Sequence, residues 1–439
     1  MLVLLVACTA EPGPPPPPRA SITSRASPSP APAPFDVAVI ASVTGPTAGT
    51  DATYLDGMRL AEAAVNDSGG VLDRPIRLEV VDDAGDPELA GSLLEQALAE
   101  RPVAAFLVGP GSVIPPRRRF IERIGAPVLL LSGDLYTSRE LFRQTFQTGV
   151  PWRWQAAVLM RYLAVDRRYT RIVAVTEAGP QEPSMREAIE RAAAEEGTDV
   201  ATTLSLVPGQ PLAEIIRAAE EAQAVIVFCS AAETARLSHA VAALPEPPQL
   251  AATSEALSPD FSSAAAPGTV AAYPYTWAGW ADPVPRVGAF RARFQAAFGR
   301  PPVGFEQEGH DAVHLLAEGL ARSGGREGDA LVRALQSFHQ VTFSSLPARF
   351  GPDDRTAIDE SQLGLFAVPA PDEALEPWLS VAPRWRPVMR TFTFDGEKTN
   401  VLDRDKQVFF PMWRKPRPSP KYWRSRYGII TRPRQDSLH

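Results

Sequence analysis

The sequence has few cysteines, few histidines and no long apolar run. Its 439 residues include only two cysteines and five histidines, so it lacks the material for a disulfide framework and offers few ligands for a metal. Cys229 lies in the apolar stretch AVIVFCS, which is typical of a buried strand, and we expect an inert core thiol that is not bridged to Cys8. No apolar stretch reaches the roughly 18 residues that a spanning helix needs, so no membrane-spanning helix is predicted.

Motifs of the common enzyme classes are also missing. There is no G-x-S-x-G nucleophile elbow, no P-loop, and no G-x-G-x-x-G after the first predicted strand. His310 and His314 stand at positions i and i+4, as in the metalloprotease motif, but Asp311 occupies the place of the glutamate base and no third ligand follows at a recognisable spacing. The sequence therefore predicts a protein that is not an enzyme and needs no metal or cofactor.

Charge is unevenly distributed along the chain. The formal net charge is -7, but residues 381–439 carry 14 Lys and Arg against 5 Asp and Glu, a net charge of +9, which leaves -16 for the rest. An acidic body is not expected to bind nucleic acid. The basic end belongs to a Trp-, Arg- and Pro-rich extension predicted over residues 371–439, which either contacts anionic lipid or a partner or is an exposed wrap of strands and loops.

The first residues resemble a bacterial lipoprotein signal. Leu5-Val6-Ala7-Cys8 fits the lipobox, whose cysteine takes a diacylglyceryl group. We expect residues 1–8 to be a signal ending at a lipidated Cys8, with a chance match as the alternative because the usual basic start is missing. Residues 9–34 are rich in Pro, Ala and Ser and predict an extended stalk. Lipid and stalk together predict a body that is anchored to a membrane outside the cytoplasm.

Beyond the stalk, apolar strands alternate with amphipathic helices. This alternation is typical of parallel, doubly wound sheets, and it restarts near residue 150, so we predict an α/β fold with two lobes. Asp86 and Pro87 are expected as the cap and first residue of one helix. Strands are predicted at 35–43, 76–83, 103–109, 126–132, 171–177, 199–206, 224–230 and 248–254, helices alone between 282 and 337, and irregular β structure from 348.

Several short pieces of this body resemble a known family. They are GGVL at 69–72, DDAGDP at 82–87 and GRPP at 299–302, together with the stretches FLVGPGSV and GAPVLLLSGD. Roughly residues 35–369 resemble the substrate-binding proteins of branched-chain amino acid ABC transporters, which have the type I periplasmic-binding-protein fold. The resemblance implies two doubly wound lobes with parallel central sheets and a three-strand hinge, which close on a ligand at the carboxyl ends of the strands.

The resemblance also implies how the chain is divided between the lobes. It places residues 35–147 and 275–343 in lobe one, and residues 148–274 and 344–370 in lobe two. The chain would then cross between the lobes three times.

The loop GPGSV and Glu255 are the candidate ligand contacts. Gly111 lets the backbone approach closely, and Ser112 opens a helix whose free N–H groups favour a carboxylate; a plain N-cap role for Ser112 is compatible with this. By resemblance, Glu255 would receive the ligand's ammonium group, and a solvated loop glutamate is the alternative. Tyr54, like Tyr273, falls on a loop that approaches the cleft by resemblance, and ordinary packing is the alternative.

Other positions depart from the family pattern. Ser132-Gly133-Asp134 replaces the Ser-Ala-Thr of the family, so a carboxylate stands where a hydroxyl is usual. Glu182 lies near the place where lobe two usually offers Tyr-Gly. Extra anions would repel a ligand carboxylate and suit a second amine, so a basic or polyamine-like ligand is one interpretation and a degenerate site is another.

These observations predict a lipid-anchored solute receptor of an ABC importer, which binds an amino acid or related small amine by lobe closure and delivers it to permease subunits. The alternative is a ligand-sensing or interaction lipoprotein of the same fold without a transport role, in which the extension docks a partner.

Overall fold

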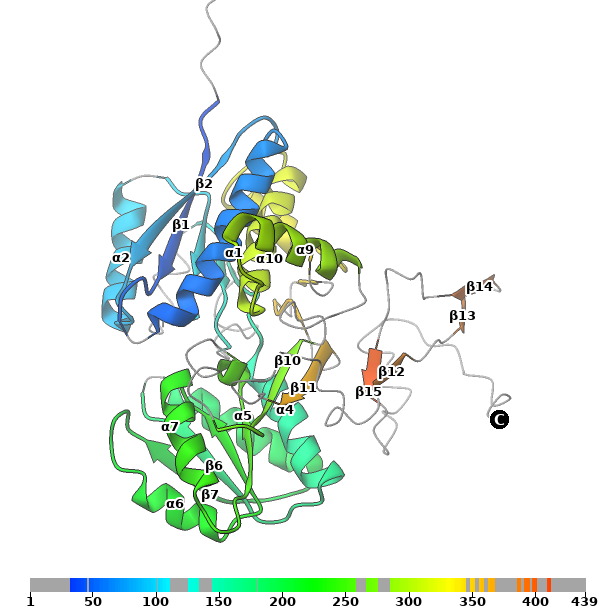
Figure 1. Cartoon of the computed structure of the whole chain (residues 1–439). Helices are drawn as coiled ribbons and strands as arrows, with labels where there is room; N and C mark the ends of the chain where they lie inside the picture. The colour runs from blue at the N-terminus through cyan, green and yellow to red at the C-terminus, as the bar shows by residue number, and fades with distance from the viewer. Residues whose placement is uncertain are drawn as a thin grey trace, which may run out of the picture.

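Two sheets with helices on both sides follow each other along the chain (Figure 1). The structure is a computed structural model. It describes residues 32–45, 47–100, 102–110, 125–133, 144–179, 181–257, 266–274, 285–344, 348–351, 355–358 and 362–367, and four short strands nearer the C-terminus. The predicted signal with Cys8, the stalk up to residue 31 and most of the extension lie outside the described residues.

The first lobe is built on a five-stranded sheet in the order β2-β1-β3-β4-β5, in which every neighbouring pair is parallel. Crossovers between parallel strands require helices, and these cover the sheet. The elements are β1 (Phe35–Ala41), α1 (Ala48–Asp67), β2 (Ile76–Asp82), α2 (Pro87–Glu100), β3 (Ala105–Val108), β4 (Val128–Leu130) and β5 (Thr145–Gln147).

The second lobe holds a six-stranded sheet in the order β11-β10-β9-β8-β6-β7, parallel except for β11, which is antiparallel to β10. Its early elements are α4 (Trp152–Arg161), the π-helix η2 (Tyr162–Asp166), β6 (Ile172–Glu177), α5 (Glu182–Glu196), β7 (Val200–Leu206) and α6 (Ala213–Glu220). The later ones are β8 (Ala224–Phe228), α7 (Ala231–Ala242), β9 (Gln249–Ala252), the 3-10 helix η3 (Ser254–Leu257), β10 (Val270–Pro274) and β11 (Leu363–Ala367).

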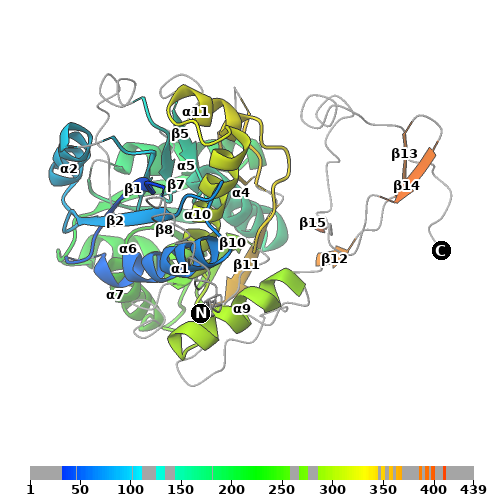
Figure 2. The same cartoon turned by 90° about the horizontal axis from the view of Figure 1, so that it is seen from above.

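Three helices between β10 and β11 return to the first lobe. They are α9 (Pro285–Phe298), α10 (Phe305–Arg322) and α11 (Asp329–Gln336). Figure 2 shows α1 and α10 side by side with α9 next to them, and α10 also contacts α11. The chain therefore passes from lobe one to lobe two after β5, back after β10, and again before β11, which gives the expected three-strand hinge.

Each of the eight predicted strands is present, and the predicted helix cap is confirmed. The Asp86 carboxylate accepts a hydrogen bond from Glu88 N at 2.9 Å, and α2 begins at Pro87. β1 and β8 are almost wholly buried, because helices cover both faces of these central strands. Cys229 follows β8 and is buried, and burial raises its pKa well above the usual thiol value.

The third crossing runs differently from the expected division at residue 344. Gln147 N donates to Arg355 O and Ala357 N donates to Gln147 O, both at 2.8 Å, so residues 355–357 lie beside β5 of the first sheet. Only β11 then reaches the second sheet. The boundary lies later because the returning chain satisfies the free edge of β5 with backbone hydrogen bonds.

Four short strands in the extension form two antiparallel pairs. β12 (Trp385–Pro387) pairs with β15 (Phe409–Pro411), and β13 (Thr391–Phe394) pairs with β14 (Glu397–Asn400).

Candidate functional site

The carboxyl ends of the lobe-one strands carry buried acidic side chains. Ser42 directly follows β1; its N–H donates to Asp51 Oδ2 at 2.7 Å and its hydroxyl donates to Asp83 Oδ1 at 2.8 Å. Both carboxylates are fully buried. A Cβ atom at Gly109, which follows β3, would lie 2.7 Å from Asp51 Oδ2, so a glycine there makes room for this carboxylate. Asp83 Oδ2 has no hydrogen-bond partner among the described residues.

The loop between β1 and α1 is fastened by Asp82. Its carboxylate accepts hydrogen bonds from the backbone of Val43 at 2.9 Å and from the hydroxyl of Thr44 at 2.7 Å. The Thr44 hydroxyl, followed by the backbone of Ala84, favours the ionised form and lowers the pKa of Asp82 to about 2. These bonds tie the start of the loop after β1 to the end of β2.

Tyr54, Tyr273 and Glu308 meet where the two lobes join. The Tyr273 hydroxyl donates to Glu308 Oε1, which links the last residues of β10 to α10. Tyr54 on α1 stacks on Phe305 with ring centroids 5.4 Å apart, and Tyr273 packs against the same ring edge-on at 5.4 Å. Both tyrosines and Phe305 are buried. Three elements thus converge on one carboxyl group.

Two glycines bring α1 and α10 into backbone contact. A Cβ at Gly57 would lie 1.8 Å from Glu306 O, and a Cβ at Gly309 would lie 2.1 Å from Tyr54 O. Only glycine allows the helices to approach this closely. The contact sets Tyr54 beside Glu308, the residue that directly precedes Gly309 on α10.

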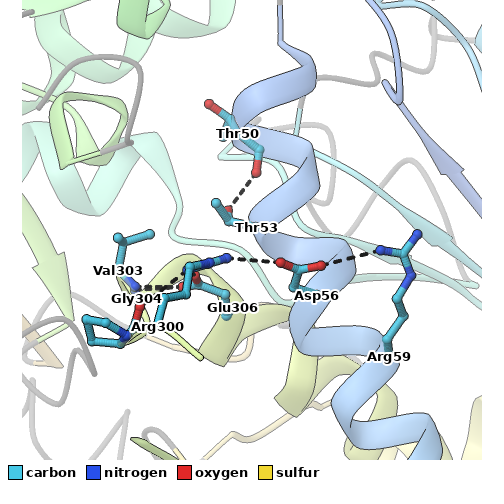
Figure 3. A network of polar contacts seen from close by, with 9 residues as sticks. Thr50, Thr53, Asp56, Arg59, Arg300, Val303, Gly304 and Glu306 are labelled. Atoms are coloured by element: carbon cyan, nitrogen blue, oxygen red, sulfur yellow. Dashed lines mark hydrogen bonds and ion pairs between the residues drawn. The ribbon is translucent and has the colours of Figure 1, made fainter. Parts of the chain in front are cut away.

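A polar network fixes the start of α10 (Figure 3). The buried Glu306 carboxylate accepts hydrogen bonds from the backbone of Val303 and Gly304 at 3.0 and 2.9 Å. Arg300 donates to Glu306 at 2.6 Å and to Asp56 on α1 at 2.9 Å. These bonds satisfy free N–H groups at the helix start and tie α10 to α1 a second time.

Glu308 is protonated at neutral pH. Burial raises its pKa to about 8; the Tyr273 hydroxyl acts in the opposite direction, and the charge of Glu255 raises it further. Burial, followed by the charges of Glu308, Glu255 and Asp51, raises the pKa of Tyr54 well above its usual value. Glu255 lies in η3 of lobe two, where Ser254 N donates to Gln155 at 2.7 Å. The site therefore gathers acidic groups of both lobes around Tyr54.

Of the predicted site residues, the structure brings Tyr54 and Glu255 together. Glu182 opens α5, where its carboxylate pairs with Arg186 at 2.7 Å and accepts a hydrogen bond from Thr176 at 3.1 Å. Burial alone would raise the pKa of Glu182, but the hydrogen bonds from Arg186, Ser205 and Thr176, together with the charge of Arg186, outweigh burial and the pKa is lowered. Its charge is thus largely compensated within lobe two.

Ser132 and Gly133 follow β4 and act through their backbones. Ser132 is buried, and its carbonyl accepts a hydrogen bond from the Gln147 side chain at 2.9 Å. The carbonyl of Gly133 accepts one from Trp152 N at 2.8 Å. Gly111, Ser112 and Asp134 lie outside the described residues.

Sequence reasoning overlooked Glu308, Asp51 and Asp83. Glu308 stands three residues after Phe305 and four before Ala312, on the apolar side of α10. A carboxyl group on that side is the signal that could have identified it. The two aspartates become visible as a pair only when β1, β2 and α1 are placed together.

The histidine pair is packed among rings. His310 and His314 have centroids 4.4 Å apart, and His314 stacks on Phe343 at 5.2 Å. Burial lowers the pKa of His314 to about 4. Among the described residues, no three His, Cys, Asp or Glu side chains form a group that could hold a metal, and no helix there is both long and apolar enough to cross a bilayer.

Comparisons with known proteins agree with the architecture. A family described as periplasmic binding protein matches residues 34–364. A type 1 periplasmic binding protein of Bordetella pertussis Tohama I superposes with a TM-score of 0.68 at 18% identity over 76% of this chain and 96% of its own. The leucine-binding protein LivK of Thermotoga maritima gives 0.67 at 15% identity, over 77% and 96%.

A solute-binding protein of an ABC transporter from Rhodopseudomonas palustris, in complex with 3,4-dihydroxybenzoic acid, gives a TM-score of 0.64 at 15% identity over 86% of this chain and 96% of its own. No curated protein matches the sequence. At these identities the similarity to solved structures establishes the fold.

Proposed function

Because the chain belongs to the periplasmic binding protein family, we propose that it is a lipid-anchored receptor of an ABC importer that binds an amino acid or related small amine between its lobes. The family implies a solute-binding protein outside the cytoplasm. Anchoring through Cys8, the ligand class and delivery to permease subunits are the finer parts of the proposal. A ligand that contacts both lobes favours the closed arrangement, which a permease can distinguish from the open one.

The observation that carries the ligand class is the acidic surrounding of Tyr54. Asp51 from lobe one and Glu255 from lobe two act on this hydroxyl as charges, and Glu308 beside the hinge adds a carboxyl group that is protonated at neutral pH. Such a site suits a positively charged amine and opposes an anion. Among the neighbours, a leucine-binding protein therefore offers a closer precedent than a binder of 3,4-dihydroxybenzoic acid.

Thermal-shift screening of the full chain tests the proposal. The panel contains amino acids, their amides, polyamines and 3,4-dihydroxybenzoate. A ligand that binds only the native state raises the midpoint temperature of unfolding. At a ligand concentration 100 times the dissociation constant, the free energy of unfolding increases by about 2.7 kcal/mol. We expect stabilisation by an amine and none by the benzoate. A chain stabilised only by the benzoate would contradict the amine proposal.

A receptor without a transport role is the second candidate. The family match ends at residue 364, and a basic extension follows it. If no compound in the panel stabilises the chain, an interaction function through this extension is favoured.

Replacing Glu255 by glutamine is expected to weaken binding of an amine found in this screen by about 2–4 kcal/mol, because a charge partner in a desolvated cleft is lost. Isothermal titration calorimetry measures the change. Glu214→Gln is the matched control, since Glu214 is an exposed glutamate on α6 of the same lobe. Equal affinities of the Glu255 variant and the control variant would remove Glu255 from the site.

A further inference from the structure

A small cavity lies where all three crossings between the lobes meet. It has a volume of about 40 Å³, which is enough to admit a water molecule. Thr148 from the first crossing, Pro274 from the second and Ile358 from the third line it. Glu308 and Asp311 of α10 line the remaining side. The carboxyl group of Glu308 is therefore in contact with the part of the molecule about which the lobes would turn.

One oxygen of this carboxyl group is tied across the lobes and the other is not. Oε1 receives the Tyr273 hydroxyl from β10 of the second sheet. Oε2 is inaccessible to solvent and has no described partner at normal hydrogen-bond distance, although the Tyr54 hydroxyl of lobe one also favours the ionised carboxyl group. A rotation of the lobes that separates β10 from α10 would break the Tyr273 bond and admit water to Oε2.

The electrostatic surroundings of Glu308 contain acids and phenols. Tyr54 faces it from α1, Tyr273 from β10, Glu255 from η3 and Asp311 from its own helix, and none of these supplies a positive charge. The residues that the third crossing places around the cavity are apolar: Val341, Phe343, Ala348, Ala357 and Ile358. Asp311 is itself held by Ser344 and His310. An ionised Glu308 would therefore be a second anion near Glu255. None of the groups named around Glu308 would compensate its charge.

We propose that Glu308 is a positioning residue that holds the two lobes together while it carries a proton and favours their separation when it loses that proton. The protonated group adds no charge to the acidic cluster and keeps its bond with Tyr273. The ionised group gains most from hydration, which the separated arrangement provides.

The direction of the pH dependence follows from the two arrangements. In the arrangement seen here the pKa of Glu308 is raised to about 8. A hydrated carboxyl group ionises near its ordinary value of 4.5. Between these values the joined arrangement binds one more proton than the separated one, so raising the pH favours separation by up to tenfold per pH unit. Lobe arrangement thus responds to pH without any ligand.

Distance measurement between spin labels tests this on the full chain without ligand. Val43 and Val207 are exposed and follow β1 and β7, at the carboxyl ends of the two sheets. Labels are attached to cysteines at both positions, with Cys8 replaced by serine; Cys229 is buried and does not take a label. From about pH 6 to about pH 8 we expect the ratio of long to short distances to rise at least tenfold.

Glu308→Gln should keep the short distances throughout this range, because glutamine accepts the Tyr273 hydrogen bond and cannot ionise. Glu318→Gln is the matched control on the exposed part of α10 and should respond like the unmodified chain. A pH response in Glu308→Gln equal to that of the control, or no response in the unmodified chain, would overturn the proposal.

Tyr273→Phe provides a second test that holds even if Glu308→Gln folds poorly. The Tyr273 hydroxyl favours the ionised form of Glu308, so its removal should raise the pKa of Glu308 in the joined arrangement. The pH at which the ratio of long to short distances stops rising should therefore be higher in this variant. If this pH were unchanged, a role for the Glu308 proton would be contradicted. These measurements need no ligand, so their outcome is independent of the proposed receptor function.

Discussion

Replacing Gly57 by alanine is expected to lower the free energy of unfolding by about 4 kcal/mol or more. The new Cβ would lie 1.8 Å from the carbonyl oxygen of Glu306, and this atom belongs to the backbone of a helix that cannot rotate away. The two helices must separate along their whole contact, which loses packing around Phe305 as well. Urea denaturation followed by far-ultraviolet circular dichroism measures the change.

Gly309→Ala tests the same contact from the other helix, and Gly288→Ala is the control. A Cβ at Gly309 would lie 2.1 Å from Tyr54 O, so a loss of similar size is expected from the opposite side of the same contact. Gly288 lies within α9, and a Cβ there would meet nothing within 4 Å. Alanine at that position should be neutral or stabilise by about 0.5–1 kcal/mol, since glycine is a poor helix former. If Gly57→Ala matched Gly288→Ala, the backbone contact between α1 and α10 would be disproved.

The second large effect concerns the pH dependence of stability. In the joined arrangement Glu308 keeps its proton up to about pH 8, whereas the unfolded chain releases it near 4.5. Between these values the folded state binds more protons, so its stability falls as the pH rises. At about 1.36 kcal/mol per pKa unit, the loss reaches up to about 5 kcal/mol. Glu308→Gln should remove this loss.

His314 acts in the opposite direction over part of the range. Its folded pKa of about 4 lies below the ordinary value of 6.5, so the unfolded chain binds more protons between these values and stability falls as the pH falls. The two effects oppose each other below about pH 6.5, and Glu308 acts alone above it. We expect the stability of the unmodified chain to decline from about pH 6.5 to 8.

Urea titrations of the unmodified chain and of Glu308→Gln across about pH 4.5 to 8.5 measure both effects. The variant should show only the acidic decline that comes from His314, and its advantage should grow steadily toward pH 8. Glu318→Gln serves again as the control, because this side chain is exposed and paired with Arg322. Parallel curves for Glu308→Gln and the unmodified chain would show that Glu308 does not hold its proton in the fold.

The regular alternation of strands and helices was sufficient to predict both lobes. Long apolar strands such as β1 and β8 have clear ends, and the Asp86-Pro87 pair marks the start of α2. Three strands next to the hinge, β5, β10 and β11, were not identified from local pattern. They have three to five residues each, and their partners are distant in sequence, as in the pairing of β10 with β11.

The site was less accessible to sequence reasoning than the fold. Tyr54 and Glu255 were predicted through a family resemblance, and the charge of Glu255 does act on Tyr54, while their contact with a ligand stays a prediction. Glu308 was overlooked because its role depends on Tyr273 and on the close approach of α1, and neither is written into the local sequence of α10. A buried carboxyl group takes its properties from side chains that other elements supply.

The edge position of β11 decides with which lobe the last described residues of the body move. β11 is the last strand of the body; it pairs with β10 at the border of the second sheet and packs against α4 of the same lobe. Residue 367, at the end of β11, therefore moves with the second lobe. A change in the angle between the lobes would therefore displace residue 367 relative to β1, at which the first lobe begins.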